Sequence, residues 1–72
     1  MKVNKSQALM FIFETLLKVG YINRNIVKDN IEIKEVTFRR YIQEIRAYLV
    51  NFNEPYEVEY NKSEDKYFLK KI

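Results

Sequence analysis

Apolar residues recur at three- and four-residue steps along the first quarter of the chain, the spacing of one face of an α-helix. The repeat consists of Leu9, Ile12, Phe13, Leu16 and Leu17. It predicts a helix over about residues 6–19, with Ser6 as the N-cap because its hydroxyl can accept a backbone hydrogen bond. The helix is expected to end before Gly20, since glycine readily adopts the left-handed conformation that follows a helix C-terminus.

Two further helices are predicted in the middle of the chain. Asn23 is a suitable N-cap for a short helix over about residues 24–30, with Ile26 and Val27 as its inward residues. The segment 31–33 interrupts the helical period, and a new apolar stripe then steps by four, three and four residues through Phe38, Ile42, Ile45 and Leu49. This stripe predicts a third helix over about residues 34–50, which ends before the loop containing Pro55.

Beyond the loop the pattern changes to alternation of apolar and polar residues, which is the period of a β-strand. Two such segments flank a polar turn and predict a β-hairpin over about residues 56–70. A two-stranded hairpin is marginal alone in water, so its apolar face is expected to pack on the helices. That face consists of Tyr56, Val58, Tyr60, Tyr67 and Leu69. The prediction is a single α+β domain over residues 1–72, with three helices followed by a two-stranded hairpin.

Composition excludes several classes of function. The chain has no Cys and no His, which removes disulfides, thiol nucleophiles, the usual zinc ligands and the histidine general base. We therefore expect no enzyme, no metal site and no cofactor. No apolar run approaches the ~18 residues of a membrane span, and the N-terminus lacks the apolar stretch of a secretory signal, so a cytoplasmic protein is expected. The net charge of +3 permits a polyanionic partner without requiring one.

The order of the predicted elements is that of a winged helix-turn-helix domain. Segments 16–24 and 31–45 resemble the N-terminal domain of DeoR-type and WYL-domain bacterial regulators, whose recognition helix typically reads Ser-x-x-Thr-hydrophobic-x-Arg-Asp-Ile-x-x-Leu. The Thr, hydrophobic, Arg, Ile and Leu positions of that pattern are matched without a gap by Thr37, Phe38, Arg40, Ile42 and Ile45. The hairpin resembles that of the family as well, so the similarity covers about residues 6–69.

Three positions depart from the pattern of this family. Glu32 stands where the turn usually has Gly, Lys34 replaces the Ser that caps the recognition helix, and Tyr41 replaces the Asp after Arg40. Lys34 cannot accept a backbone N–H bond, and its charge opposes the positive end of the helix dipole. A phosphate bound at this point would make the lysine favourable.

The resemblance implies that the third helix enters the major groove of double-stranded DNA and that the hairpin wing reaches the flanking backbone. The candidate DNA contacts are Arg24, Lys34, Glu35, Thr37, Arg39, Arg40, Gln43, Lys62 and Lys66. Arg and Gln are suited to this role because they bind guanine and adenine edges with two hydrogen bonds. The alternative is that these side chains form surface pairs with one another, such as Arg40 with Glu44, and Arg46 fits either interpretation.

Two functional hypotheses follow. The first is sequence-specific DNA binding by a small transcriptional regulator of a bacterium or phage, with the helix over 34–50 as the recognition helix. A single module offers few contacts, so a homodimer on two half-sites is an expected arrangement, with Met10, Phe11, Phe52 and the hairpin as candidate interface. The second is a protein interaction module, an adaptor or antirepressor, that uses the same fold without DNA.

Overall fold

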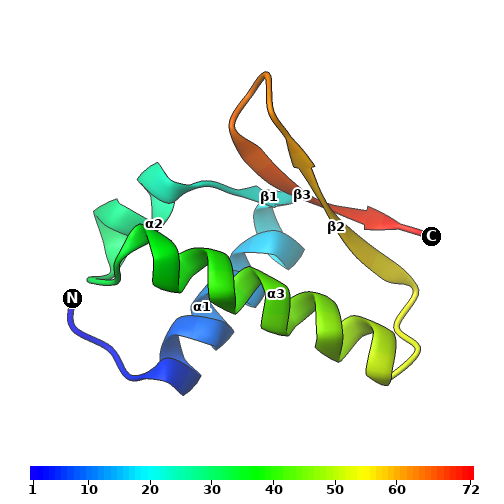
Figure 1. The fold of residues 1–72 in the computed structure, drawn as a ribbon, viewed down its shortest axis with the longest axis horizontal. Coiled ribbons are helices and arrows are strands. Elements are labelled where there is room, and N and C mark those ends of the chain that lie inside the picture. The colour runs from blue at the N-terminus through cyan, green and yellow to red at the C-terminus, as the bar shows by residue number, and fades with distance from the viewer.

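A computed structural model describes all 72 residues, and its elements follow the order α1, β1, α2, α3, β2, β3 (Figure 1). The helices are α1 (Lys5–Val19), α2 (Arg24–Asn30) and α3 (Glu35–Asn51), and the strands are β1 (Tyr21–Ile22), β2 (Tyr56–Asn61) and β3 (Lys66–Lys71). Each helix end lies within one residue of its predicted position. The prediction of an α+β domain with three helices is confirmed. None of these helices has the length and apolar character needed to cross a membrane.

The predicted hairpin is confirmed as β2 and β3, but the sheet has a third strand, β1, that was not predicted. β1 pairs antiparallel with β3, placing Tyr21 opposite Phe68 and Ile22 opposite Tyr67, and the strand order is β1-β3-β2. A strand of two residues is too short to show alternation in the sequence, and its pairing depends on a partner more than 40 residues later. The strand matters for the fold because it buries Ile22 completely and ties the end of α1 to the hairpin.

The core lies between α1, α3 and the inner face of the sheet. It is one cluster of buried apolar side chains: Ala8, Ile12, Leu16, Ile22, Val27, Ile31, Phe38, Ile42, Ile45, Leu49 and Val58. The four residues of the predicted stripe on α3 all belong to it. No polar or charged residue is buried, so every candidate functional side chain lies at least partly on the surface.

Helix α1 begins at a capping box, two residues earlier than a Ser6 cap would allow. The Asn4 Oδ1 atom accepts a hydrogen bond from the Gln7 N–H at 2.8 Å, and the Gln7 Oε1 atom accepts from the Asn4 N–H at 3.3 Å. The prediction of Ser6 as N-cap was wrong because this reciprocal pair satisfies two backbone donors, whereas a lone hydroxyl satisfies one. Ser6 lies inside the helix.

The other predicted ends of helices are confirmed. Gly20 follows α1 with a φ of 94°, in the left-handed region, and its N–H donates to the Leu16 carbonyl at 3.0 Å. Asn23 caps α2, since its Oδ1 atom accepts from the Ile26 N–H at 2.9 Å. These two caps bracket β1 and fix the direction in which the chain enters α2.

The turn end of the hairpin projects away from the three helices, as Figure 1 shows. Val58 is buried on the inner face, but Tyr60, two residues closer to the turn, is 42% exposed. The expectation that Tyr60 packs on the helices was wrong because the strand has by then passed the edge of the core. Its ring packs on Tyr67 instead, with ring centroids 4.8 Å apart.

Candidate nucleic-acid interface

One side of α3 is exposed along its first half and carries several of the predicted contact residues. Phe38 and Ile42 face the core, whereas Arg39, Arg40 and Gln43 are exposed. Arg39 and Gln43 are four residues apart and therefore lie on one face of the helix, with Arg40 beside them. The interface thus presents two arginines, each able to donate two parallel hydrogen bonds, and a glutamine whose amide can donate one and accept one.

The first turn of α3 has no side-chain cap. Lys34 occupies the N-cap position with an extended backbone and makes no capping hydrogen bond, so the first helical residue is Glu35 rather than Lys34. The Glu35 carboxylate in the first turn interacts favourably with the positive end of the helix dipole. Thr37 is half-buried in the same turn, and its hydroxyl makes no hydrogen bond within the protein. Lys34 and Thr37 therefore both retain free hydrogen-bonding groups beside exposed backbone donors.

A network of ion pairs joins the start of α2, the start of α3 and the turn of the hairpin. Arg24 Nη1 donates to Glu35 Oε1 at 2.6 Å, and Arg24 Nε donates to Asp65 Oδ2 at 3.1 Å. Arg39 Nη2 donates to Glu35 Oε2 at 3.3 Å, and the Tyr60 hydroxyl donates to Asp65 Oδ1 at 2.7 Å. We call these five residues the Arg24 cluster. It brings together Arg24, Glu35 and Arg39 from the predicted contacts.

Hydrogen bonds within the Arg24 cluster favour the ionised forms of Arg24 and Asp65 and the neutral form of Tyr60. The bond to Glu35, together with the negative charges of Asp65 and Glu35, raises the pKa of Arg24. The bond from Tyr60 and the charge of Arg24 lower the pKa of Asp65, and the same bond raises the pKa of Tyr60. Two arginines face two carboxylates, so the cluster as a whole is neutral at pH 7.

Three predicted contacts keep a positive charge without an ion-pair partner: Lys34, Arg40 and Lys62. The alternative pair of Arg40 with Glu44 is not formed. Glu44 lies instead 3.1 Å from the Nζ atom of Lys5 on α1. Packing of α1 against α3 therefore occupies Glu44 and leaves the guanidinium of Arg40 free.

The two lysines of the hairpin differ in their surroundings. Lys62 in the turn is exposed and unpaired. Lys66 is half-buried, with its Nζ atom 4.3 Å from the centre of the Tyr21 ring and 3.8 Å from Glu64. A cation over an aromatic face is held by the ring quadrupole, so Lys66 is directed toward β1. Lys62 is the one of the two that is free to reach a neighbouring molecule.

Sequence reasoning missed Tyr60 and Asp65 as members of the site. In the sequence, Asp65 is only a negative charge that opposes DNA contact by the wing, yet in the structure it joins the wing to α2. Its backbone φ of 53° is left-handed, a conformation that Asp tolerates better than most residues. An acidic residue at the end of a polar turn is the only sequence signal for this role, and nothing local connects it to Arg24.

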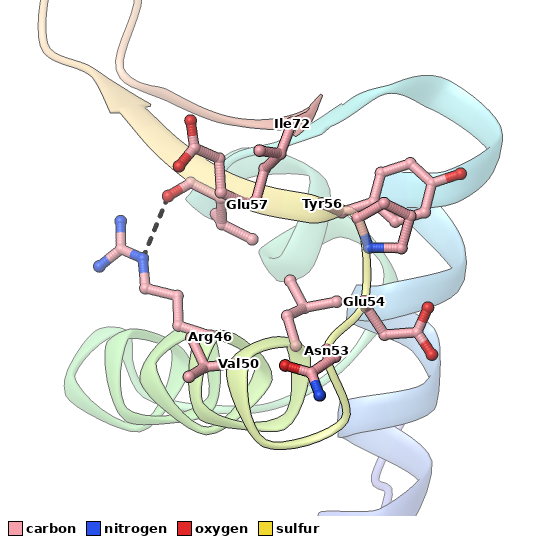
Figure 2. Close-up of a pocket in the computed structure, with 10 residues that line it drawn as sticks. Arg46, Val50, Asn53, Glu54, Tyr56, Glu57 and Ile72 are labelled. Atoms are coloured by element: carbon pink, nitrogen blue, oxygen red, sulfur yellow. Dashed lines mark hydrogen bonds between the residues drawn. The ribbon is translucent and has the colours of Figure 1, made fainter.

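Arg46 lies outside the interface. Its Nε atom donates to the Val58 carbonyl at 3.2 Å, which holds the half-buried side chain against the free edge of β2 (Figure 2). Arg46 lines the largest cavity, about 570 Å³ between the end of α3, the following loop and β2. That cavity is at the opposite end of α3 from the Arg24 cluster. Arg46 does not form the surface ion pair that was the alternative to DNA contact, and its hydrogen-bond partner is instead a backbone carbonyl.

No three Asp or Glu side chains lie close enough together to hold a metal ion. Comparison with protein-family models, curated proteins and solved structures finds no match to this chain. Its function must be inferred from its own residues. These residues form a helix face with guanidinium and amide groups. Unpaired lysines lie at the start of the same helix, at Lys34, and in the hairpin turn, at Lys62.

Proposed function

We propose that this chain is a winged helix-turn-helix domain that binds double-stranded DNA in a sequence-specific manner, as a small transcriptional regulator of a bacterium or phage. The observation that carries the proposal is the exposed row of Arg39, Arg40 and Gln43 on α3, a helix whose other side buries Phe38 and Ile42 in the core. The buried stripe holds the helix rigidly, so the exposed side chains are presented from a fixed surface.

Helix α3 has the dimensions that the major groove accepts. An α-helix with its side chains is about 10–12 Å across, and the major groove of B-DNA is about 12 Å wide. In this proposal Arg40 and Gln43 reach base edges, where arginine pairs best with guanine and glutamine with adenine. Arg40 is a stronger candidate for base recognition than Arg39. Arg39 must break its ion pair with Glu35 before it can bind a base, whereas Arg40 forms no ion pair within the protein.

The DNA backbone is contacted by groups that surround the first turn of α3. Lys34 at the N-cap and Lys62 in the hairpin turn are unpaired cations on either side of the Arg24 cluster. Thr37 can donate its hydroxyl to a phosphate or contact a thymine methyl group. Lys66 contributes to the local positive potential while packed on Tyr21.

Two arginines of the Arg24 cluster exchange partners when DNA binds. Arg24 and Arg39 are held by Glu35 and Asp65 in the free protein, and all four side chains are exposed. Exposed ion pairs are weak, so a phosphate can replace a carboxylate at little cost. Glu35 then serves as the group that orients both arginines before DNA arrives.

A second candidate function is protein interaction by an adaptor or antirepressor of the same fold. The neutral Arg24 cluster and the modest net charge of +3 favour it, because they weaken attraction to polyanions. Apolar side chains exposed on the helices, Met10 and Phe52 among them, also favour it. Salt dependence distinguishes the two candidates, since contacts with phosphates weaken steeply with salt and apolar contacts do not.

Selection from a pool of random duplexes tests the proposed function. The purified chain is expected to enrich a defined sequence over successive rounds, and the enriched duplex should be bound more tightly than its scrambled version. An Arg40→Ala variant should lose this preference while retaining weak binding to all duplexes. If the wild-type chain enriches no sequence, the proposal of sequence-specific recognition is wrong.

A further inference from the structure

Apolar side chains are exposed together on the surface where α1 packs against α3. Met10, Phe13 and Leu17 follow one another at three- and four-residue steps on α1. Tyr48 lies in the last turn of α3, and Phe52, four residues later, is the C-cap that follows this helix. Ring centroids are 6.2 Å apart for Phe13 and Tyr48 and 4.8 Å apart for Tyr48 and Phe52, so the two helices form one continuous surface. We call these five residues the α1/α3 apolar face.

The exposed area of this face is large for a chain of 72 residues. Met10 is 71% exposed, Phe52 66%, Leu17 52% and Tyr48 45%. At ~200 Å² for a whole large apolar side chain, the exposed parts of these four amount to about 470 Å². A stable interface needs about 800 Å² from each partner, so these side chains supply more than half of one side.

We propose that a second copy of this chain covers the α1/α3 apolar face and forms a two-fold symmetric homodimer. The charges beside the face favour this occupant. Lys5 pairs with Glu44 at 3.1 Å, and Lys18 pairs with Glu14 at 3.6 Å. In a two-fold dimer, a charged side chain close to the axis faces the same side chain of the other chain. Two unpaired like charges would repel each other, whereas two neutral ion pairs do not.

The shape of the face is also self-complementary. A hollow of about 510 Å³ opens between α1 and α3 and is lined by Leu9, Met10, Phe13, Glu44, Ile45 and Tyr48. Phe52 stands beside this hollow and is mostly exposed. In a two-fold dimer each copy offers both parts, so the Phe52 ring of one chain can fill the hollow of the other.

Only part of the interface expected from the sequence belongs to this surface. Met10 and Phe52 are exposed within it. Phe11 precedes Phe13 by two residues and therefore lies on a different side of α1, so it is not part of the α1/α3 apolar face. The hairpin is not part of it either, which leaves Lys62 free for DNA in the dimer.

Sedimentation equilibrium without DNA tests the inference, over chain concentrations from about 1 μM to about 1 mM. The wild-type chain is expected to approach twice its mass of 8.8 kDa. Phe52→Glu and Met10→Glu, made separately, should each shift the dissociation constant upward by at least about 10-fold. Val50→Glu is the matched control, because Val50 is 75% exposed on the same helix but outside the face.

Circular dichroism of each variant verifies that the fold is retained. A wild-type chain that stays monomeric over the whole range overturns the inference, as does a dimer that persists unchanged in both the Phe52→Glu and Met10→Glu variants. A monomer that binds DNA in a sequence-specific manner overturns only the dimer, and a dimer that binds no DNA overturns only the proposed function.

Discussion

Arg24 Nε donates a hydrogen bond to Asp65 Oδ2 at 3.1 Å, which connects the first residue of α2 to the end of the hairpin turn 41 residues later. Asp65 also accepts from Tyr60 on β2, so one carboxylate fixes the wing relative to the helices. The same contact neutralises one of the arginines proposed to approach DNA. Asp65 therefore both positions the wing and competes with phosphate for Arg24.

Substitution Asp65→Asn tests this competition. The amide oxygen can still accept the hydrogen bond from Tyr60, whereas the oxygen that accepts from Arg24 is replaced by an NH2 group and the negative charge is gone. DNA affinity at low salt should rise about three- to tenfold, because Arg24 no longer has to leave a carboxylate in order to contact a phosphate. Fluorescence anisotropy with labelled duplex measures the affinity, with Glu57→Gln as a control at an exposed carboxylate without an ion pair. Weaker binding by the Asn variant would mean that positioning of the wing outweighs competition.

The hydrogen bond between Tyr60 and Asp65 makes stability depend on pH in a defined window. The folded-state pKa of Asp65 is lowered from 3.8, so its stabilising contribution is present above about pH 3.8 and is lost as pH falls through the lower value. The folded-state pKa of Tyr60 is raised from 10.0, so its contribution is full below pH 10.0 and is lost as pH rises through the higher value. An NMR titration of the Asp65 carboxyl should show its pKa move upward in Tyr60→Phe; an unchanged value would show that the bond is not formed in solution.

Gly20→Ala should destabilise the chain through backbone conformation alone. Gly20 has a φ of 94°, and an added Cβ atom would meet no other atom within 4 Å. The expected cost is about 1–2 kcal/mol, the penalty for a side chain in the left-handed region. Urea denaturation measures it, and Gly20→Asn should cost less because Asn tolerates this conformation better. Equal stability of wild type and Gly20→Ala would contradict the left-handed cap.

Phe38→Ala should have the largest effect on stability among substitutions in α3. Phe38 is 2% exposed and meets Tyr67 edge to face at 5.6 Å, so it joins the proposed recognition helix to β3. A decrease of about 3–5 kcal/mol in the free energy of unfolding is expected, which is a large part of the stability of a small domain. Thermal denaturation followed by circular dichroism measures the decrease, and Arg40→Ala should leave the transition unchanged. A decrease below about 1 kcal/mol would mean that Phe38 is not a core residue.

The helices could be predicted from the sequence because each has a local apolar period and a local signal at one end. Asn23 marks the start of α2, and Gly20 marks the end of α1. The start of α1 was mispredicted although a sequence signal exists, since Asn4 and Gln7 have the spacing of a capping box. The exposed side of α3 could be predicted from the apolar period, because burial of the stripe that contains Phe38 and Ile42 leaves the other side of the helix in solvent.

The remaining features depend on contacts between distant parts of the chain. β1 exists because Tyr21 and Ile22 pair with Phe68 and Tyr67, and two residues carry no pattern of their own. The Arg24 cluster depends on the placement of the hairpin turn over α2, and the partner of Glu44 is chosen by the packing of α1 on α3. Charge pairs at the surface are weak, so sequence spacing alone does not decide which of them form.

The most direct test of DNA recognition is a titration of wild type and the double variant Arg39→Ala/Arg40→Ala against a selected duplex at two salt concentrations. The proposal predicts that wild-type affinity falls steeply with salt and that the double variant binds at least about 100-fold more weakly, at roughly 1.4 kcal/mol for each arginine removed. Lys70→Ala/Lys71→Ala removes the same charge at the C-terminal end of β3, outside both proposed surfaces, and should have a much smaller effect. Undiminished binding by the arginine variant, or no binding by wild type even at low salt, would contradict recognition of DNA by α3.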